Sequence, residues 1–438
     1  MRRVLSISLD VAIIYGSILF TFYLLRKTEM LADFQKNFEA FKIIYPFIGI
    51  LYLILMYTFE LYNISRKMLS DVIYTVSLIS ISLMIGIMGI CFFVRDVAWA
   101  FPRSVIIISG LIYFVCLLLK STLYWYISHR LWAIKKIIIV GKDSEKLYRI
   151  IVNNYSRFYD VIGQYSEFDS TLLSKIKLVD MVFICADIQL EMREIILPAC
   201  FKYNKEVCFV PQYSDLSIIS SSLSKTGDIP TFRIANMELS PEECVVKRAV
   251  DLVFGTIAAI LSLPVALVSM ILIKLDGGPI FYMQERLTKG NQRFKIYKFR
   301  TMVPDAEKIS GPVLAGDKDT RITPLGKFLR AVRLDELPQI INVLKGDMSL
   351  VGPRPERPFF AEQFEKEMQE YRFRLKVKAG LTGLAQVEGK YNTSVEDKLR
   401  YDLIYINNYS VLRDFVIMVQ TIKILFLKES TEGVTSNT

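Results

Sequence analysis

Asp335 and Glu336 are adjacent carboxylates that lie between two arginines, Arg330 and Arg354. Apolar residues recur at helical spacing before the pair, and Pro338 suits the first turn of a following helix. Asp335 is therefore predicted to be the N-cap of that helix, where the helix dipole and Arg330 favour its ionised form. An ionised carboxylate aimed at a phosphate can act as a nucleophile. An isolated Asp-Glu pair would more simply be a helix cap and an exposed first-turn acid.

Three longer motifs include or flank this pair. LDELPQ occupies residues 334–339, GDMSLVGPRP occupies residues 346–355, and KFRTM occupies residues 298–302. Together they resemble the motifs of the bacterial polyprenyl-phosphate hexose-1-phosphate transferases, which are large monotopic phosphoglycosyl transferases of the undecaprenyl-phosphate galactose or glucose phosphotransferase type. The resemblance covers residues 247 to about 427, whereas the amino-terminal part resembles the longer members in layout only.

The resemblance implies an enzyme that transfers a sugar 1-phosphate from a UDP-sugar to undecaprenyl phosphate and releases UMP. Galactose or glucose is the expected hexose. In the implied mechanism Asp335 attacks the β-phosphorus, and the lipid phosphate then displaces the phosphosugar from the enzyme. Asp335 and Glu336 are expected to hold Mg²⁺, which neutralises the diphosphate. This reaction would be the first membrane step in exopolysaccharide, capsule or O-antigen synthesis.

The same resemblance assigns further residues to substrate binding. Cationic side chains would bind phosphate oxygens, namely Lys298, Arg300, Arg330 and Arg354. The rest of the expected substrate-binding set is Gln339, Pro355, Arg357, Thr382, Gln386 and Lys390. Lys390 stands where the family usually has arginine, so the charge is kept and the bidentate fork is lost. If residues 298–300 are extended, Lys298 and Arg300 share one side and Phe299 lies in the core.

The composition indicates a membrane protein with water-facing parts. Of the 438 residues, 52% are hydrophobic and 22% are charged, and the mean hydropathy is +0.35. The net charge is +10, and basic residues concentrate at 286–330 after an apolar run, which favours phosphorylated lipid or nucleotide diphosphate over nucleic acid. The six cysteines have no CxxC spacing and the one histidine is His129. A zinc site, a disulfide framework and histidine acid–base chemistry are therefore disfavoured.

Four apolar runs precede residue 130, at about 4–25, 41–62, 72–94 and 105–127, and each is long enough to span a bilayer. We expect a four-helix transmembrane bundle over residues 1–130. Asp10 lies in the first run, where an acid is a candidate functional residue, but it is near enough to the end of the run to reach the headgroups. An even number of crossings puts both ends on one face, which must be cytoplasmic if the later domains use a nucleotide. The expected location is the bacterial inner (cytoplasmic) membrane, as a multi-pass protein with cytoplasmic soluble domains.

Residues 136–240 have the pattern of a small Rossmann-like α/β module. β-Branched runs at 137–140, 179–184 and 207–210 alternate with amphipathic helices at 145–155 and 190–203. The turn at 141–146 has one glycine where a dinucleotide fingerprint needs three. A docking or dimerisation module is therefore favoured over a cofactor site, and we expect a homodimer.

Residues 243–438 form the expected catalytic domain, which should be mostly α-helical. An apolar run at about 247–274 contains Pro264, which would kink it, and a crossing would separate the α/β module from the motifs. A re-entrant membrane helix is therefore predicted, in agreement with the resemblance. Lys247 and Arg248 would then lie within reach of a lipid phosphate or headgroup. A last helix over about 405–427 has one apolar face and should lie in the membrane interface.

Two alternatives remain open from the sequence. The protein could be a non-enzymatic membrane scaffold or nucleotide sensor of a polysaccharide assembly system, in which case residues 136–240 alone would bind a nucleotide. Alternatively, the two carboxylates could serve only as metal ligands while both substrates react directly in a ternary complex. Detection of a phosphosugar adduct would separate these two mechanisms.

Overall fold

Four long apolar helices make up most of the described amino-terminal residues. They are α1 (Arg2–Lys27), α2 (Phe34–Thr58), α3 (Leu69–Phe93) and α5 (Arg103–Leu131). The computed structural model describes residues 2–29, 33–59, 61, 69–93, 101–131, 134–167, 170–219, 221–234, 236–303, 319, 321–389 and 393–425. The chain separates into two units, residues 1–136 with 150–160 and residues 137–149 with 161–438.

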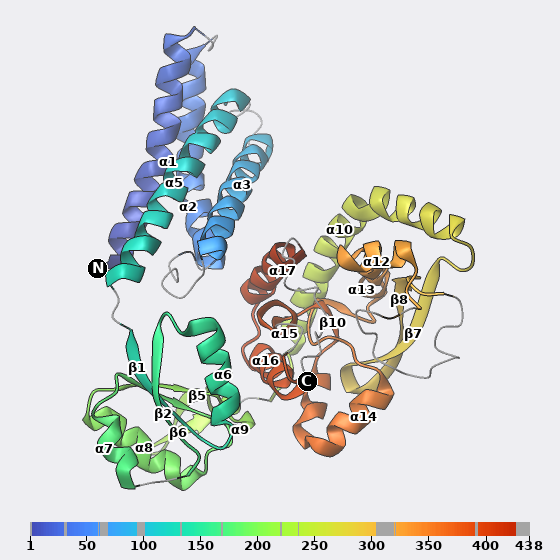
Figure 1. The fold of residues 1–438 in the computed structure, drawn as a ribbon. Helices are drawn as coiled ribbons and strands as arrows, with labels where there is room; N and C mark the ends of the chain where they lie inside the picture. Colours follow the sequence, from blue (N-terminus) through green and yellow to red (C-terminus); the bar gives the residue numbers. More distant parts are fainter. Residues whose placement is uncertain are drawn as a thin grey trace. The chain divides into compact units, whose positions relative to one another are not determined.

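The four amino-terminal helices pack against one another (Figure 1). α1 and α3 both contact α5, and α2 contacts α3. Ile48 and Leu83 are buried between helices, whereas Phe20 and Ile85 are exposed on the outside. Each helix is long and apolar enough to cross a membrane. An apolar outer surface on helices of this length is typical of transmembrane segments.

Asp10 lies inside this helical group and not at the headgroups. Its side chain is fully buried, and the Lys120 Nζ lies 2.6 Å from one carboxylate oxygen. Tyr52 donates a hydrogen bond of 2.9 Å to the other oxygen, and Lys120 also lies 2.6 Å from Ser6 Oγ. The expectation that Asp10 reaches the headgroups is therefore wrong. The buried charge is tolerated because neighbouring helices supply a cation and a hydroxyl.

A small parallel sheet follows, with the strand order β2–β1–β3–β4. The strands are β1 (Lys135–Val140), β2 (Tyr159–Tyr165), β3 (Met181–Ile184) and β4 (Glu206–Phe209). The accompanying helices are α6 (Ser144–Tyr155), α7 (Ser170–Ile176), α8 (Leu190–Lys202) and α9 (Tyr213–Ile219). β1 pairs in parallel with β3, and β3 pairs in parallel with β4. Each strand and helix predicted for this region from the sequence is present.

Several elements of this region were not predicted, namely β2, α7, α9 and the antiparallel hairpin of β5 (Ser222–Thr226) and β6 (Ile229–Arg233). β2 contains Asp160 and Gly163, residue types that disfavour strands. The hairpin turns at Gly227, whose φ of +65° lies in the left-handed region that glycine adopts readily. These segments are short or polar, so hydrophobic periodicity does not reveal them.

The carboxyl-terminal part is mostly helical, as expected. Its helices are α10 (Pro241–Leu275), α12 (Pro324–Ala331), α13 (Gln339–Lys345), α14 (Pro358–Glu367), α15 (Leu384–Glu388), α16 (Val395–Asn407) and α17 (Val411–Leu425). β7 (Phe281–Thr288) and β8 (Gln292–Phe299) form an antiparallel hairpin, and β9 (Ser349–Val351) pairs in parallel with β10 (Gly380–Thr382). Buried side chains such as Val343, Met348 and Leu403 form their shared core.

The last helix predicted over 405–427 is in fact two helices, α16 and α17. The break lies between Asn407 and Val411. Ser410 Oγ accepts a hydrogen bond of 3.1 Å from the Arg413 N–H, and asparagine and serine favour helix ends because their side chains compete for backbone groups. The position of α17 in the membrane interface remains a prediction.

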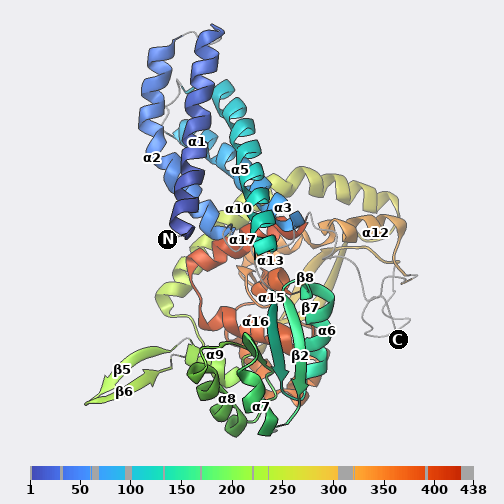
Figure 2. The same ribbon diagram turned by 60° about the vertical axis from the view of Figure 1, so that its left-hand side comes forward.

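α10 turns sharply partway along its length (Figure 1, Figure 2). Pro264 lies inside this helix, where it removes one backbone donor. Near the start of α10, Asp251 accepts hydrogen bonds of 2.9 Å from the side chain of Ser349 and the N–H of Leu350. Near its end, Ile273 packs with apolar residues of β8 and α12. Both limbs of α10 therefore contact the carboxyl-terminal part.

Candidate active site

Asp335 and Glu336 lie in a 3-10 turn, Leu334–Glu336, between α12 and α13. The residue before the turn, Arg333, has a φ of +54° in the left-handed region, which is uncommon for a residue with a side chain. α13 begins only at Gln339. The prediction that Asp335 N-caps the next helix is therefore wrong, because a separate turn lies between the two helices.

Two cations hold Glu336. The Lys298 Nζ donates a hydrogen bond of 2.9 Å to Glu336 Oε1, and the Arg354 guanidinium donates one of 2.7 Å to the same oxygen. Asp335, by contrast, makes no hydrogen bond or ion pair with any residue that the structure describes. Of the two adjacent carboxylates, Glu336 is fixed and Asp335 is available to contact a ligand.

The two carboxyl groups differ in acidity. Burial raises the pKa of Asp335, the charge of Glu336 raises it further, and the nearby cations only partly oppose this. Burial also acts to raise the pKa of Glu336, but the charges of Arg354 and Lys298 outweigh it and hold that pKa well below its usual range. The expectation that its surroundings favour ionised Asp335 is therefore wrong. Glu336 is the acid that its surroundings keep ionised.

Two more arginines complete a cationic cluster around these acids, which consists of Lys298, Arg330, Arg333 and Arg354. Arg330 Nε donates a hydrogen bond of 2.9 Å to Thr301 Oγ1, and its charge lowers the pKa of Asp335. Burial lowers the pKa of Arg333, although the charges of Glu336 and Asp335 oppose this shift. Arg333 was missed from the sequence, where no motif or spacing distinguishes it from other arginines. Four cations beside a free carboxylate can bind a phosphorylated ligand.

Arg300 lies away from this cluster. Its side chain is buried, donates a hydrogen bond of 3.2 Å to the Ile273 carbonyl and lies 3.5 Å from Asp276 at the end of α10. Phe299 is buried as predicted. Lys298 and Arg300 have different partners, Glu336 for Lys298 and the Ile273 carbonyl with Asp276 for Arg300.

The remaining expected substrate-binding residues are spread over the domain. Gln339 is buried with an exposed fraction of 2%. Thr382 is buried and shares a hydrogen bond of 2.6 Å with Thr421, and Gln386 donates one of 3.2 Å to the Leu381 carbonyl. Gln339 and Thr382 are therefore interior residues, whereas Gln386 is only partly buried. Lys390 lies outside the described residues.

Pro355 and Arg357 follow Arg354, the last residue of the cluster, in the chain. The Pro355 carbonyl accepts a hydrogen bond of 3.3 Å from Arg286. The Arg357 guanidinium lies 6.0 Å from the centre of the Phe360 ring. The charge of Arg357 and that of Arg354 both lower the pKa of Arg286, for which burial is the largest cause.

Lys247 and Arg248 make interior contacts. The Lys247 Nζ lies 2.6 Å from Asp414 and 3.0 Å from the Tyr405 hydroxyl, and Lys247 is 6% exposed. Arg248 donates hydrogen bonds of 2.7 and 2.8 Å to the carbonyls of Val343 and Leu344 at the end of α13. These contacts occupy both side chains and argue against the expected contact with lipid headgroups.

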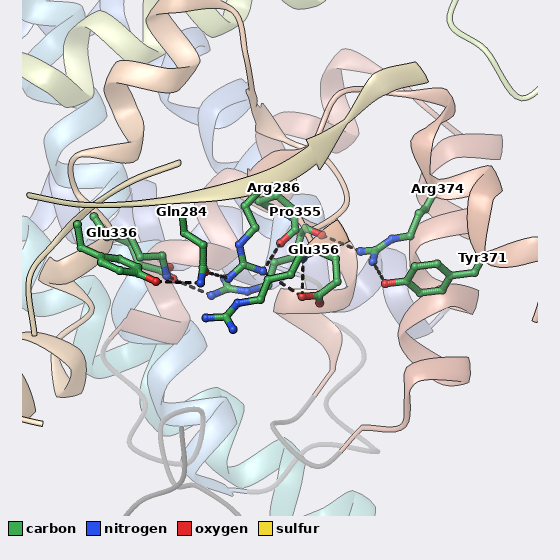
Figure 3. A network of polar contacts seen from close by, with 11 residues as sticks. Gln284, Arg286, Glu336, Pro355, Glu356, Tyr371 and Arg374 are labelled. Carbon is green, nitrogen blue, oxygen red and sulfur yellow. Dashed lines mark hydrogen bonds and ion pairs between the residues drawn. The ribbon is translucent and has the colours of Figure 1, made fainter. Parts of the chain in front are cut away.

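A network of polar contacts that includes Arg286 and Arg374 extends from Glu336 to Tyr371 (Figure 3). Arg286 lies 3.0 Å from Glu356 and also donates a hydrogen bond of 2.8 Å to Gln284. Arg374 donates a hydrogen bond of 2.8 Å to the Arg354 carbonyl. Arg286 and Arg374 were not selected from the sequence, because they lie far along the chain from the acids that they support.

Asp335 and Glu336 are the two carboxylates at the expected Mg²⁺ site. In the described part of the chain, no three histidine, cysteine or acidic side chains come together. Mg²⁺ commonly uses one or two carboxylates and completes its shell with water and substrate phosphate oxygens. Asp335 and Glu336 supply the two carboxylates of such a shared site. The cationic cluster would repel a metal ion that arrived alone, so the diphosphate would have to bring the ion or bind with it.

The family model for bacterial sugar transferases matches residues 242–428. A UDP-N-acetylgalactosamine-undecaprenyl-phosphate N-acetylgalactosaminephosphotransferase of Aeromonas hydrophila is 44% identical over 188 residues, which are 42% of this chain and 44% of that protein. An undecaprenyl-phosphate galactose phosphotransferase of Salmonella typhimurium is 31% identical over 241 residues, which are 51% of this chain and 50% of that protein. The chain thus spans about half the length of these two relatives.

A shorter relative is matched over most of its length. It is a putative undecaprenyl-phosphate N-acetylgalactosaminyl 1-phosphate transferase of Bacillus subtilis, 51% identical over 131 residues that make up 30% of this chain and 73% of that protein. The region that the family model matches, residues 242–428, contains the 3-10 turn with its two acids and the cations around them. The chain belongs to the bacterial sugar transferase family.

Proposed function

We propose that this protein is a phosphoglycosyl transferase that moves a sugar 1-phosphate from a UDP-sugar to undecaprenyl phosphate and releases UMP. The observation that carries the proposal is the pair of adjacent acids, in which Glu336 is fixed by Lys298 and Arg354 while Asp335 has no partner in the described residues. The names of the relatives support the same substrates. The reaction would be the first membrane step of exopolysaccharide, capsule or O-antigen synthesis.

In the proposed mechanism a carboxylate oxygen of Asp335 attacks the β-phosphorus of the UDP-sugar. A bond forms between this oxygen and phosphorus, and the bond from phosphorus to the bridging oxygen breaks, so that UMP leaves with that oxygen. An oxygen of the lipid phosphate then attacks the same phosphorus and releases Asp335. The cationic cluster stabilises the charge on the phosphate oxygens in both steps. Asp335 must be ionised to attack, so its raised pKa should limit activity in acid.

Mg²⁺ is the proposed cofactor. When bound by Asp335, Glu336 and the diphosphate, it would neutralise negative charge and make UMP a better leaving group. Glu336 supports this role because Lys298 and Arg354 keep it ionised and fixed. We expect no binding of the metal to the protein alone and binding in the presence of UDP.

The sugar remains to be assigned. The relatives from Aeromonas hydrophila and Bacillus subtilis are named for N-acetylgalactosamine, and the one from Salmonella typhimurium is named for galactose. We therefore add N-acetylgalactosamine to the hexoses expected from the sequence, galactose and glucose. A panel of these UDP-sugars, assayed with undecaprenyl phosphate in detergent, would identify the donor.

We further propose that α10 is a re-entrant membrane helix and that the soluble parts lie in the cytoplasm beneath the inner membrane. Contacts of both limbs of α10 with the carboxyl-terminal part support a helix that returns to its starting face. A lipid acceptor would then meet the acids at the membrane surface. A homodimer is also expected, and light scattering of the purified protein in detergent would measure it.

The deciding experiment compares Asp335→Asn and Glu336→Gln with the unchanged protein. Asp335→Asn keeps the volume and removes the nucleophile, so turnover should fall below a tenth while expression and detergent-extracted size are unchanged. Release of UMP without lipid acceptor, stoichiometric with enzyme, would support the covalent intermediate. Retention of a tenth or more of turnover by Asp335→Asn would instead favour direct reaction in a ternary complex. Nucleotide binding by residues 136–240 without any turnover of the full chain would favour the non-enzymatic scaffold.

A further inference from the structure

We propose that Arg374, fixed by Asp402, is a positioning residue for sugar-phosphate transfer because it holds the backbone of Arg354 and thereby directs the Arg354 side chain to Glu336. This inference rests on the proposed function. It concerns a buried ion pair on the far side of the 352–356 backbone from the acids. Figure 3 shows Arg374 and Tyr371 at one end of the network and Glu336 at the other.

The backbone of residues 352–356 is held at each residue. Pro353 and Pro355 have no backbone N–H, so at these residues the main chain can be held only through its carbonyls. Three of the five contacts come from backbone groups: the Gly352 N–H to the Thr382 carbonyl, the Gly380 N–H to the Pro353 carbonyl and the Leu287 N–H to the Glu356 carbonyl. The other two come from the side chains of Arg374 and Arg286, which donate to the carbonyls of Arg354 and Pro355. Side chains therefore hold the segment at the residue that reaches the acids and at the next one.

Arg374 is built to keep one orientation. It is 9% exposed, and its guanidinium lies 2.9 Å from Asp402, whose side chain is 3% exposed. It also donates a hydrogen bond to the Tyr371 hydroxyl. A buried guanidinium needs a charged partner and filled donors, and these contacts supply both. The bond from Arg374 to the Arg354 carbonyl, 2.8 Å long, thus comes from a side chain that cannot easily turn away.

Arg354 depends on such an anchor. Its side chain is 49% exposed, yet its guanidinium lies 2.7 Å from Glu336. A half-exposed arginine loses rotamer entropy when it holds one geometry in water. An anchored backbone reduces this cost because fewer conformations remain to be lost. Without Arg374, the Arg354 carbonyl would lose its donor, and the contact with Glu336 would be held less often.

A purely structural role and a positioning role predict different results. If Arg374 only stabilises the fold, its removal lowers the melting temperature, and its effects on activity and those of Arg354 multiply. If it acts through Arg354, the second substitution adds little once the first is made.

The test is a double-mutant cycle of Arg374→Gln and Arg354→Gln in the full chain in detergent, with Arg372→Gln as the control. Arg372 lies in the same 3-10 helix, Gln369–Lys376, and is exposed. We expect Arg374→Gln to lower kcat/KM for UMP release by about 10- to 100-fold, the double variant to match Arg354→Gln, and the control to match the unchanged protein. Tyr371→Phe removes a single contact of the Arg374 guanidinium and should cause a smaller loss of the same kind.

A second readout does not depend on activity. Arg354→Gln should lower the melting temperature of the unchanged protein but not that of the Arg374→Gln variant. The inference is overturned if Arg374→Gln and Tyr371→Phe leave kcat/KM unchanged, or if the two arginine substitutions are additive in both cycles. Absence of turnover in the unchanged protein would refute the proposed function, and the melting-temperature cycle would still decide whether Arg374 holds Arg354.

Discussion

Removal of the Lys247 ammonium should lower the stability of the carboxyl-terminal part. The loss should come from the interior ion pair and not from a lost contact with lipid. Lys247 Nζ lies 2.6 Å from Asp414, and the side chains are 7% and 3% exposed. Removal of one partner of a buried ion pair costs about 3 to 5 kcal/mol, because the other charge is left without compensation. For a domain of this size the loss corresponds to a fall in melting temperature of about 6 to 20 °C. We therefore expect Lys247→Met to melt that much lower in detergent.

The partner substitution makes this prediction specific. Lys247→Met with Asp414→Leu replaces the pair by apolar side chains and should recover most of the loss, because the Tyr405 hydroxyl keeps the Val351 carbonyl as acceptor. Lys274→Met, an exposed change on the same helix, is the matched control and should have no effect. A normal melting temperature for Lys247→Met, combined with weaker binding to anionic lipid, would refute the interior ion pair and restore the headgroup contact expected from the sequence.

Three further predictions concern the acids, the amino-terminal helices and the topology. Lys298→Gln removes a charge that lowers the pKa of Asp335. The acid limb of the pH profile of kcat/KM for this variant should therefore lie at higher pH than in the unchanged protein. An acid limb at unchanged or lower pH would contradict the role of Asp335. Asp10→Asn should lower the melting temperature, because it leaves the partly buried Lys120 without its anion, and an unchanged melting temperature would show that this ion pair does not stabilise the helices. Single cysteines at the exposed positions Glu145 and Gln292, in a cysteine-free background, should resist an impermeant thiol reagent in intact cells and react after lysis, whereas labelling at Gln292 alone in intact cells would mean that α10 crosses the membrane.

The sequence by itself was sufficient for the elements with strong local signals. The apolar runs predict four membrane helices because about 20 apolar residues have few other uses. The 298–302, 334–339 and 346–355 motifs identify the family and the two acids, since long motifs are rarely matched by chance. The β-branched runs predict three strands of the parallel sheet. The apolar runs, the motifs and the β-branched runs each depend only on residues that are close together in the sequence, so they can be recognised without the tertiary structure.

Only the tertiary structure decided what each charge does. Lys247 and Lys298 are both lysines beside apolar residues in the sequence, yet Lys247 is neutralised in the interior by Asp414 and Lys298 holds Glu336 at the candidate site. Asp335 and Glu336 are neighbours with opposite pKa shifts. A charged group's behaviour depends on its burial and on the charges near it in space, and here those charges come from β8, α12 and the 352–356 segment. No local pattern carries that information, because the contacts join residues far apart in the chain.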